Sequence, residues 1–175
     1  MHSRPPSSCL PIILAAPLGL VAGVVHAGLV FSFSSTGNSQ ADAAFAAAGA
    51  RWSSDFTDNV TINVNAGFAV LAPGVLASTS TAAVLAPYTM VRDALIADAT
   101  SADDATAVAH LPVGSVNMLI NRTANDPNGA GSATPYLDAN GSANNRTIAM
   151  TRADAKALGL IAGNNATIDA NITFN

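Results

Sequence analysis

Few side chains in this chain of 175 residues could perform hydrolytic or metal chemistry. It has 3 histidines, and only His110 lies beyond the apolar amino-terminal stretch; all 11 acidic residues are aspartates. A catalytic zinc needs about three protein ligands and a base that takes a proton from bound water. Because the chain has no glutamate, it contains no His-Glu-x-x-His zinc helix. We therefore predict no catalytic residue and no cofactor-binding residue here.

Other nucleophilic systems are also missing. A Ser-His-Asp triad would have to use His110, and no Gly-x-Ser-x-Gly turn is present to expose a serine. His110 shortly precedes Pro112 at a predicted helix end, where an imidazolium favours the negative end of the helix dipole, so we predict a structural role. Lys156 is the only lysine, and we expect it on the solvent-exposed face of a helix. The sequence also lacks a Gly-x-x-x-x-Gly-Lys phosphate loop.

Aspartate and asparagine gather between residues 122 and 145, a long polar segment that we interpret as a loop. Asp126, Asp138 and Asn140 are the candidate metal ligands, because calcium takes oxygen ligands from such loops. The segment does not match an EF-hand loop, since Gly141 comes too early and no glutamate closes the site. The favoured alternative is that these side chains bond their own backbone in turns.

The first 27 residues have the pattern of a secretory signal peptide. Arg4 precedes an apolar run over residues 10–25, and the small residues around Ala27 predict cleavage between Ala27 and Gly28. The run is shorter than the roughly 20 residues of a membrane span. An uncleaved amino-terminal anchor is the alternative. We expect a secreted protein with no membrane partner after cleavage, in which residues 28–175 form one domain.

Charge and cysteine content bear on two further properties, the binding of nucleic acid and the presence of disulfide bonds. The net charge is −4 and charged residues make up 10% of the chain, which argues against nucleic acid as a partner, since binding its phosphates requires basic patches. The one cysteine, Cys9, lies in the predicted signal peptide, so the mature chain has no disulfide.

Hydrophobic periodicity predicts an α/β (α+β) fold with a single mixed β-sheet and helices mainly on one face. On the first predicted helix, Ala41, Phe45, Ala48 and Trp52 share an apolar stripe that we expect to pack on the sheet. A capping-box pattern at Thr151 and Asp154 predicts the start of the last helix. The predicted strands cover residues 29–34, 60–65, 78–86, 115–121, 147–150 and 166–174, and the helices cover residues 40–52, 87–98, 101–110 and 151–158.

Four blocks of this sequence resemble a family of secreted bacterial zincin-type zinc metalloproteases, whose members often carry a PEP-CTERM sorting tail. The blocks are residues 43–68 (AAFAAAGARWSSDFTDNVTINVNAGF), 99–109 (ATSADDATAVA), 119–138 (LINRTANDPNGAGSATPYLD) and 147–160 (TIAMTRADAKALGL). The resemblance implies that residues 28–175 correspond to the amino-terminal subdomain of a zincin catalytic domain. That family places its His-Glu-x-x-His helix beyond the point where this chain stops, so we interpret the chain as a partial metalloprotease-like domain, inactive as supplied.

By the same resemblance, the full-length protein would bind zinc and hydrolyse a peptide or protein substrate. One sheet edge would hold the substrate as an added strand, and residues 115–121 are the candidate edge. The alternative is a non-enzymatic secreted or surface-associated binding module. A partial domain should leave one sheet face uncovered, which exposes an apolar patch and favours aggregation, whereas an independent module should unfold cooperatively as a monomer or a defined oligomer.

Overall fold

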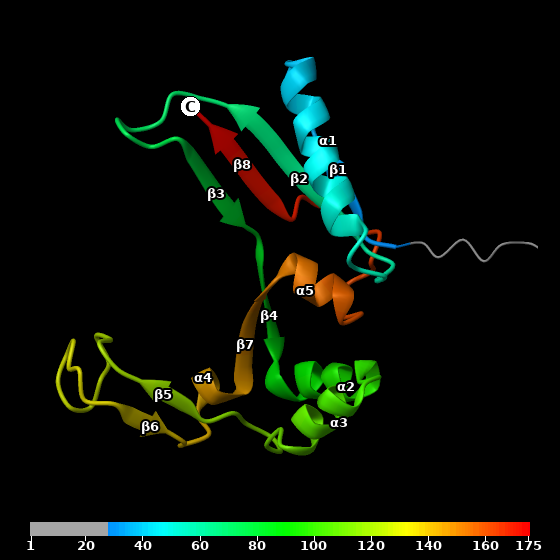
Figure 1. Ribbon diagram of the computed structural model, residues 1–175. Coiled ribbons are helices and arrows are strands. Elements are labelled where there is room, and N and C mark those ends of the chain that lie inside the picture. The colour runs from blue at the N-terminus through cyan, green and yellow to red at the C-terminus, as the bar shows by residue number, and fades with distance from the viewer. Residues whose placement is uncertain (1–27) are drawn as a thin grey trace, which may run out of the picture.

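The computed structural model describes residues 28–175, so the predicted signal peptide, including Ala27, lies outside the described residues (Figure 1). The mixed αβ composition is confirmed. The elements are β1 (Val30–Phe33), α1 (Ser39–Ser53), β2 (Thr61–Phe68), β3 (Ala77–Thr81), β4 (Ala83–Pro87), α2 (Tyr88–Asp98), α3 (Ala102–Ala109), β5 (Met118–Ile120), β6 (Tyr136–Asp138), α4 (Ala143–Arg146), β7 (Thr147–Thr151), α5 (Arg152–Ala157) and β8 (Ala170–Phe174).

The predicted mixed sheet is confirmed as a four-stranded sheet with the order β1-β2-β8-β3. Strands β1, β2 and β8 are parallel, and β3 runs antiparallel to β8 at one edge. Strand β8 is the last in the sequence but lies between β2 and β3 (Figure 1). The carboxyl-terminal segment is therefore an interior strand, and the two edges are β1 and β3.

The two faces of this sheet differ in chemistry. Parallel pairing of Phe31 with Ile62 and of Phe33 with Val64 places these apolar side chains on one face. The opposite face carries a row of hydrogen-bonded polar side chains that crosses all four strands. Ser34 at the end of β1 donates to Asn65 (3.0 Å), Asn65 donates to Asn171 (3.2 Å), and Asn171 donates to Ser80 (3.4 Å). This polar face can be solvated, so the apolar face is the one that needs cover.

Helix α1 covers the apolar face beside β1. Its buried residue is Gly49, where an added Cβ would lie 3.0 Å from atoms of both Phe31 and Phe33, so the helix approaches β1 closely because this position has no side chain. The ring of Phe45 lies 5.3 Å from that of Phe33. Trp52, predicted to pack on the sheet, is instead 56% exposed and stacks on Phe56, because the helix is rotated to bring Gly49 and not Trp52 onto β1.

The remaining strands form two antiparallel ribbons, β4-β7 and β5-β6, outside the main sheet. The predicted extended segment 78–86 is divided at Ala82 into β3, which joins the sheet, and β4, which pairs with β7. The segment 122–145, predicted as a loop, contains β6 and all but the last residue of α4. Strand β5 pairs with β6 alone, so the prediction that residues 115–121 form the substrate-binding edge of the main sheet is wrong.

Side-chain hydrogen bonds cap the starts of α1, α3 and α5, whereas α2 and α4 have no such cap. Thr151 and Asp154 form the predicted capping box at α5, and Gly159, which follows the helix, has a φ of +69°. At α1, the carboxylate of Asp42 accepts bonds from the Thr36 hydroxyl (2.6 Å), the Thr36 amide (2.8 Å) and the Ser35 hydroxyl (2.7 Å). These bonds, those of Thr36 first, lower the pKa of Asp42 below its ordinary value because they favour the ionised carboxylate.

Candidate functional site

His110 lies at the carboxyl end of α3. Its Nδ1 is 2.7 Å from the carbonyl oxygen of Thr106, one helical turn earlier, and the residue is exposed. This contact with its own helix agrees with the structural role predicted for it. Among residues 28–175, no three His, Cys, Asp or Glu side chains gather as a metal-binding group, so this part of the chain does not fit a catalytic zinc.

The calcium candidates belong to opposite ends of the β5-β6 ribbon. Asp138 pairs with Met118 at the end of the ribbon remote from the connecting loop, whereas Asp126 lies in that loop, beyond the Ile120–Tyr136 pair. The two carboxylates therefore belong to separate local structures. Each makes the predicted turn contact with its own backbone. Asp126 Oδ1 accepts the amide of Asn128 (2.8 Å), and Asp138 Oδ1 accepts that of Asn140 (3.4 Å).

Asp138 is part of a buried polar cluster that joins the ribbon to α4. Its Oδ2 accepts the side-chain amide of Asn144 at 2.7 Å. The amide group of the fully buried Asn145 donates to the carbonyl oxygens of Val116 (2.8 Å) and Asp138 (3.0 Å). Both Asp138 oxygens thus have partners within the fold. The cluster has a structural role, because it connects the β5-β6 ribbon to α4.

A buried ionic cluster joins α5 to the main sheet, and the sequence analysis missed it. Lys156, predicted to be solvated, is 2% exposed, and its Nζ lies 2.5 Å from Oδ2 of the equally buried Asp169. Lys156 also donates to the carbonyl oxygen of Thr61 (2.8 Å), and Asp169 Oδ2 accepts the amide of Asn63 (2.8 Å). Nε of Arg152 lies 3.6 Å from Asp169 Oδ1. These internal partners identify the cluster as a structural connection between α5, β2 and the start of β8.

One feature that the fold leaves unexplained is an open apolar groove between α1 and the main sheet. The rings of Phe45, Phe174 and Phe68 form a row with centroid distances of 5.8 and 6.4 Å. Phe68 is 53% and Phe174 38% exposed, although both lie on the apolar face. We call this feature the aromatic groove; its volume is about 320 Å³, and it is lined by Ala41, Ala44, Phe45, Ala48, Phe68 and Phe174.

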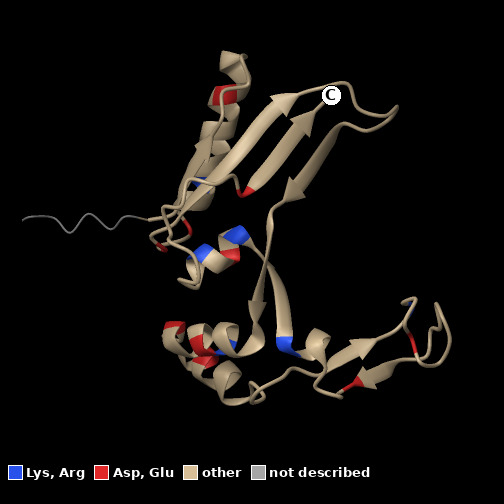
Figure 2. Ribbon diagram, turned by 180° about the vertical axis from the view of Figure 1, so that it is seen from behind, with Lys and Arg blue, Asp and Glu red and all other residues tan. Residues whose placement is uncertain are grey.

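The aromatic groove includes most of the helical stripe that was expected to pack on the sheet. Ala41, Phe45 and Ala48 face it, so the stripe borders the sheet face without being buried by it. The main sheet also carries almost no charged side chains, as Figure 2 shows from behind. Surfaces that another protein segment covers have these features, namely an apolar helix stripe, exposed phenylalanines and a sheet without charged side chains.

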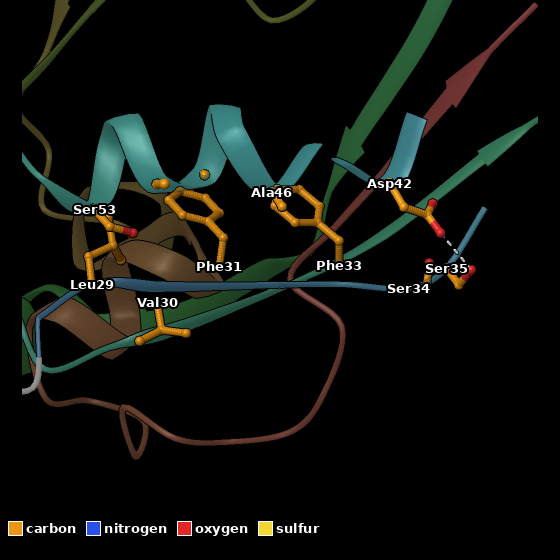
Figure 3. A pocket seen from close by; sticks show the side chains of 11 residues that line it. Leu29, Val30, Phe31, Phe33, Ser34, Ser35, Asp42, Ala46 and Ser53 are labelled. Carbon is orange, nitrogen blue, oxygen red and sulfur yellow. Dashed lines mark hydrogen bonds between the residues drawn. The ribbon is translucent and has the colours of Figure 1, made fainter. Parts of the chain in front are cut away.

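A second cavity lies between α1 and the free edge of β1. Its volume is about 590 Å³, and Phe31 and Phe33 project into it while Val30 points to the other side of the strand (Figure 3). Asp42 lies at one end of this cavity, but its carboxylate oxygens are occupied by Ser35 and Thr36. The walls of the cavity are mainly apolar, and Asp42 is not available to orient a substrate.

Comparisons with models of protein families, with curated proteins and with solved structures return no match. Within residues 28–175, none of the helices has both the length and the apolar character of a membrane span.

Proposed function

We propose that this chain is the amino-terminal part of a secreted zinc metallopeptidase, in which a later segment of the same protein supplies the zinc ligands and the catalytic base. The proposal starts from the four blocks that resemble zincin-type proteases. The mixed sheet with an antiparallel edge strand, β3, is compatible with that resemblance. Residues 28–175 contribute the sheet and α1 but do not themselves form a zinc site.

The observation that carries the proposal is the uncovered aromatic groove. The apolar face has a helix over β1, whereas Phe68 on β2 and Phe174 on β8 remain half-exposed. Leaving such apolar area in water costs about 25 cal/mol per Å² relative to burying it. A further apolar helix packed beside α1 would cover this groove and complete the layer over the sheet. An uncovered apolar face of this kind supports the proposal of a partial catalytic domain.

The test is to read the gene beyond the codon for Asn175 in all frames and to assay the encoded proteins on casein. We expect a downstream His-Glu-x-x-His sequence. The extended protein should hydrolyse casein in a chelator-sensitive manner, and residues 1–175 should not. Chelator-sensitive hydrolysis by residues 1–175 alone would overturn the proposal, as would a downstream sequence with no such motif.

A second candidate is a non-enzymatic secreted binding module, and the hydrogen-bonded polar face favours it. The row of Ser34, Asn65, Asn171 and Ser80 shows that this side of the sheet is compatible with water without another layer. The behaviour of the chain in solution separates the two candidates, because a partial domain with an open apolar groove should associate, whereas an independent module should unfold cooperatively as a monomer or a defined oligomer.

A further inference from the structure

The loop between β5 and β6 contains a buried carboxylate oxygen that the fold does not satisfy. Asp126 is 5% exposed, and its Oδ2 is buried with no hydrogen-bond partner among the described residues. The other oxygen, Oδ1, accepts the amide of Asn128. A buried ionised carboxylate is costly unless hydrogen bonds or an opposite charge compensate it.

The loop closes on itself, and several of its backbone amides donate to carbonyl oxygens of the loop. The amide of Arg122 donates to Ser132 across the base of the loop (2.6 Å), and that of Gly131 donates to Thr123 (2.8 Å). The amide of Gly129 donates to the carbonyl oxygen of Asp126 (3.0 Å). These donors are bound to carbonyl oxygens and are therefore not available to Asp126 Oδ2.

No basic side chain compensates Asp126 either. The ion pairs in the described part of the chain involve only Asp93 and Asp169 as acids. Arg122 belongs to the same loop, but it does not pair with Asp126; its backbone is held at a φ of +56°, in the left-handed region that a non-glycine residue adopts at a cost. A closed loop that contains a buried, uncompensated carboxylate oxygen and a residue in the left-handed region has the features of a site that binds a cation.

We propose that the loop 122–132 binds a calcium ion through Asp126 Oδ2. A hard cation would supply the missing positive charge, and carbonyl, hydroxyl and amide oxygens of the loop are the ligand type that calcium takes. With a single carboxylate, the dissociation constant should fall in the weak range of extracellular calcium modules, about 10⁻⁴–10⁻³ M. Asp138 and Asn140, the other sequence candidates, are excluded because their local contacts are complete. This site is independent of the proposed peptidase activity.

The test uses trypsin cleavage after Arg122, which is exposed in the loop, with cleavage after Arg51 in α1 as the internal control. Calcium at about 10 mM should slow cleavage after Arg122 by about tenfold to a hundredfold, since protection scales as one plus the ratio of ligand concentration to dissociation constant. Cleavage after Arg51 should not change. The substitution Asp126→Asn should abolish the protection, whereas Asp98→Asn, which removes an exposed carboxylate of α2, should retain it.

Absence of calcium protection at Arg122 in the unsubstituted chain would overturn the proposal, as would equal protection in the Asp126→Asn variant. Circular dichroism establishes whether that variant is folded. If the variant is unfolded, the test rests on whether calcium protects the Arg122 bond and not the Arg51 bond in the unsubstituted chain. Chelator-reversible protection at Arg122 without protection at Arg51 supports the site, and equal slowing at both bonds contradicts it.

Discussion

Lys156 and Asp169 show how one buried ion pair connects segments distant in the sequence. Lys156 reaches the backbone of β2 through Thr61, and Asp169 binds the same strand through the amide of Asn63. The pair was not predicted because a two-turn helix with charges at Arg152, Asp154 and Lys156 does not indicate which charge faces the protein. The deciding partner, Asp169, lies outside the helix, and only the chain path brings it close.

Replacing Lys156 by methionine should strongly destabilise the fold. The substitution leaves Asp169 buried with Arg152 as its only cationic neighbour, and breaking one side of a buried pair typically costs about 3–5 kcal/mol. Urea unfolding followed by circular dichroism measures the free energy of unfolding. The matched control is Arg51→Met, at an exposed position, which should change that free energy little. Equal stabilities of the two variants would show that Lys156 is solvated.

Helices were predicted better than strand pairing, because their signals are local. The capping pair at Thr151 and Asp154 lies three residues apart, and both the pattern and the bonds are present. Strand pairing depends on distant partners, such as the 31-residue separation of the paired Val30 and Thr61. Residues 78–86 satisfy an extended pattern throughout, yet the chain passes from the main sheet to the β4-β7 ribbon at Ala82. The backbone amide of Ala82 donates to the carbonyl oxygen of Asp169. Alternation of residue types carries no information about this division.

Asp42, in the first turn of α1, gives the protein an acid-sensitive element. The pKa of Asp42 is lowered in the folded state by its bonds to Thr36 and Ser35, so its contribution to stability is fully present above the unfolded value near 3.8. That contribution is lost as the pH falls through the lower folded pKa. Asp42→Asn should therefore reduce the free energy of unfolding at pH 6, and the difference from the unsubstituted chain should shrink below about pH 3.8. Urea unfolding at a series of pH values measures the free energy of unfolding of both proteins and hence the difference between them.

For Asp42→Asn, the exposed Asp98 again supplies the control. Asp98→Asn should change the free energy of unfolding at pH 6 little, because its exposed side chain makes no hydrogen bond in the described part of the chain. A constant difference between Asp42→Asn and the unsubstituted chain at every pH would mean that the substitution acts through packing and not through ionisation.

At the scale of the whole molecule, the main sheet has one polar face that can be solvated and one apolar face that is only partly covered. The amphipathic pattern of the strands predicted two unlike faces, but it did not predict that α1 would cover the β1 side and leave Phe68 and Phe174 exposed. That outcome depends on the helix orientation set by Gly49 and on the interior position of β8, both of which arise from tertiary packing. For the same reason, the sequence suggested Asp126 as a metal ligand but could not indicate that Asp138 lies at the other end of the ribbon.

The aromatic groove should make the chain self-associate. Replacing Phe68 and Phe174 together by serine removes two exposed aromatic rings from the groove, and sedimentation of this variant should shift towards monomer relative to the unsubstituted chain. Val113→Ser is the matched control, because Val113 is highly exposed but belongs to the segment after α3 and not to the groove; this variant should associate like the unsubstituted chain. If the unsubstituted chain is instead a monomer that unfolds cooperatively, the groove needs no cover, and the binding module becomes the better account of this protein.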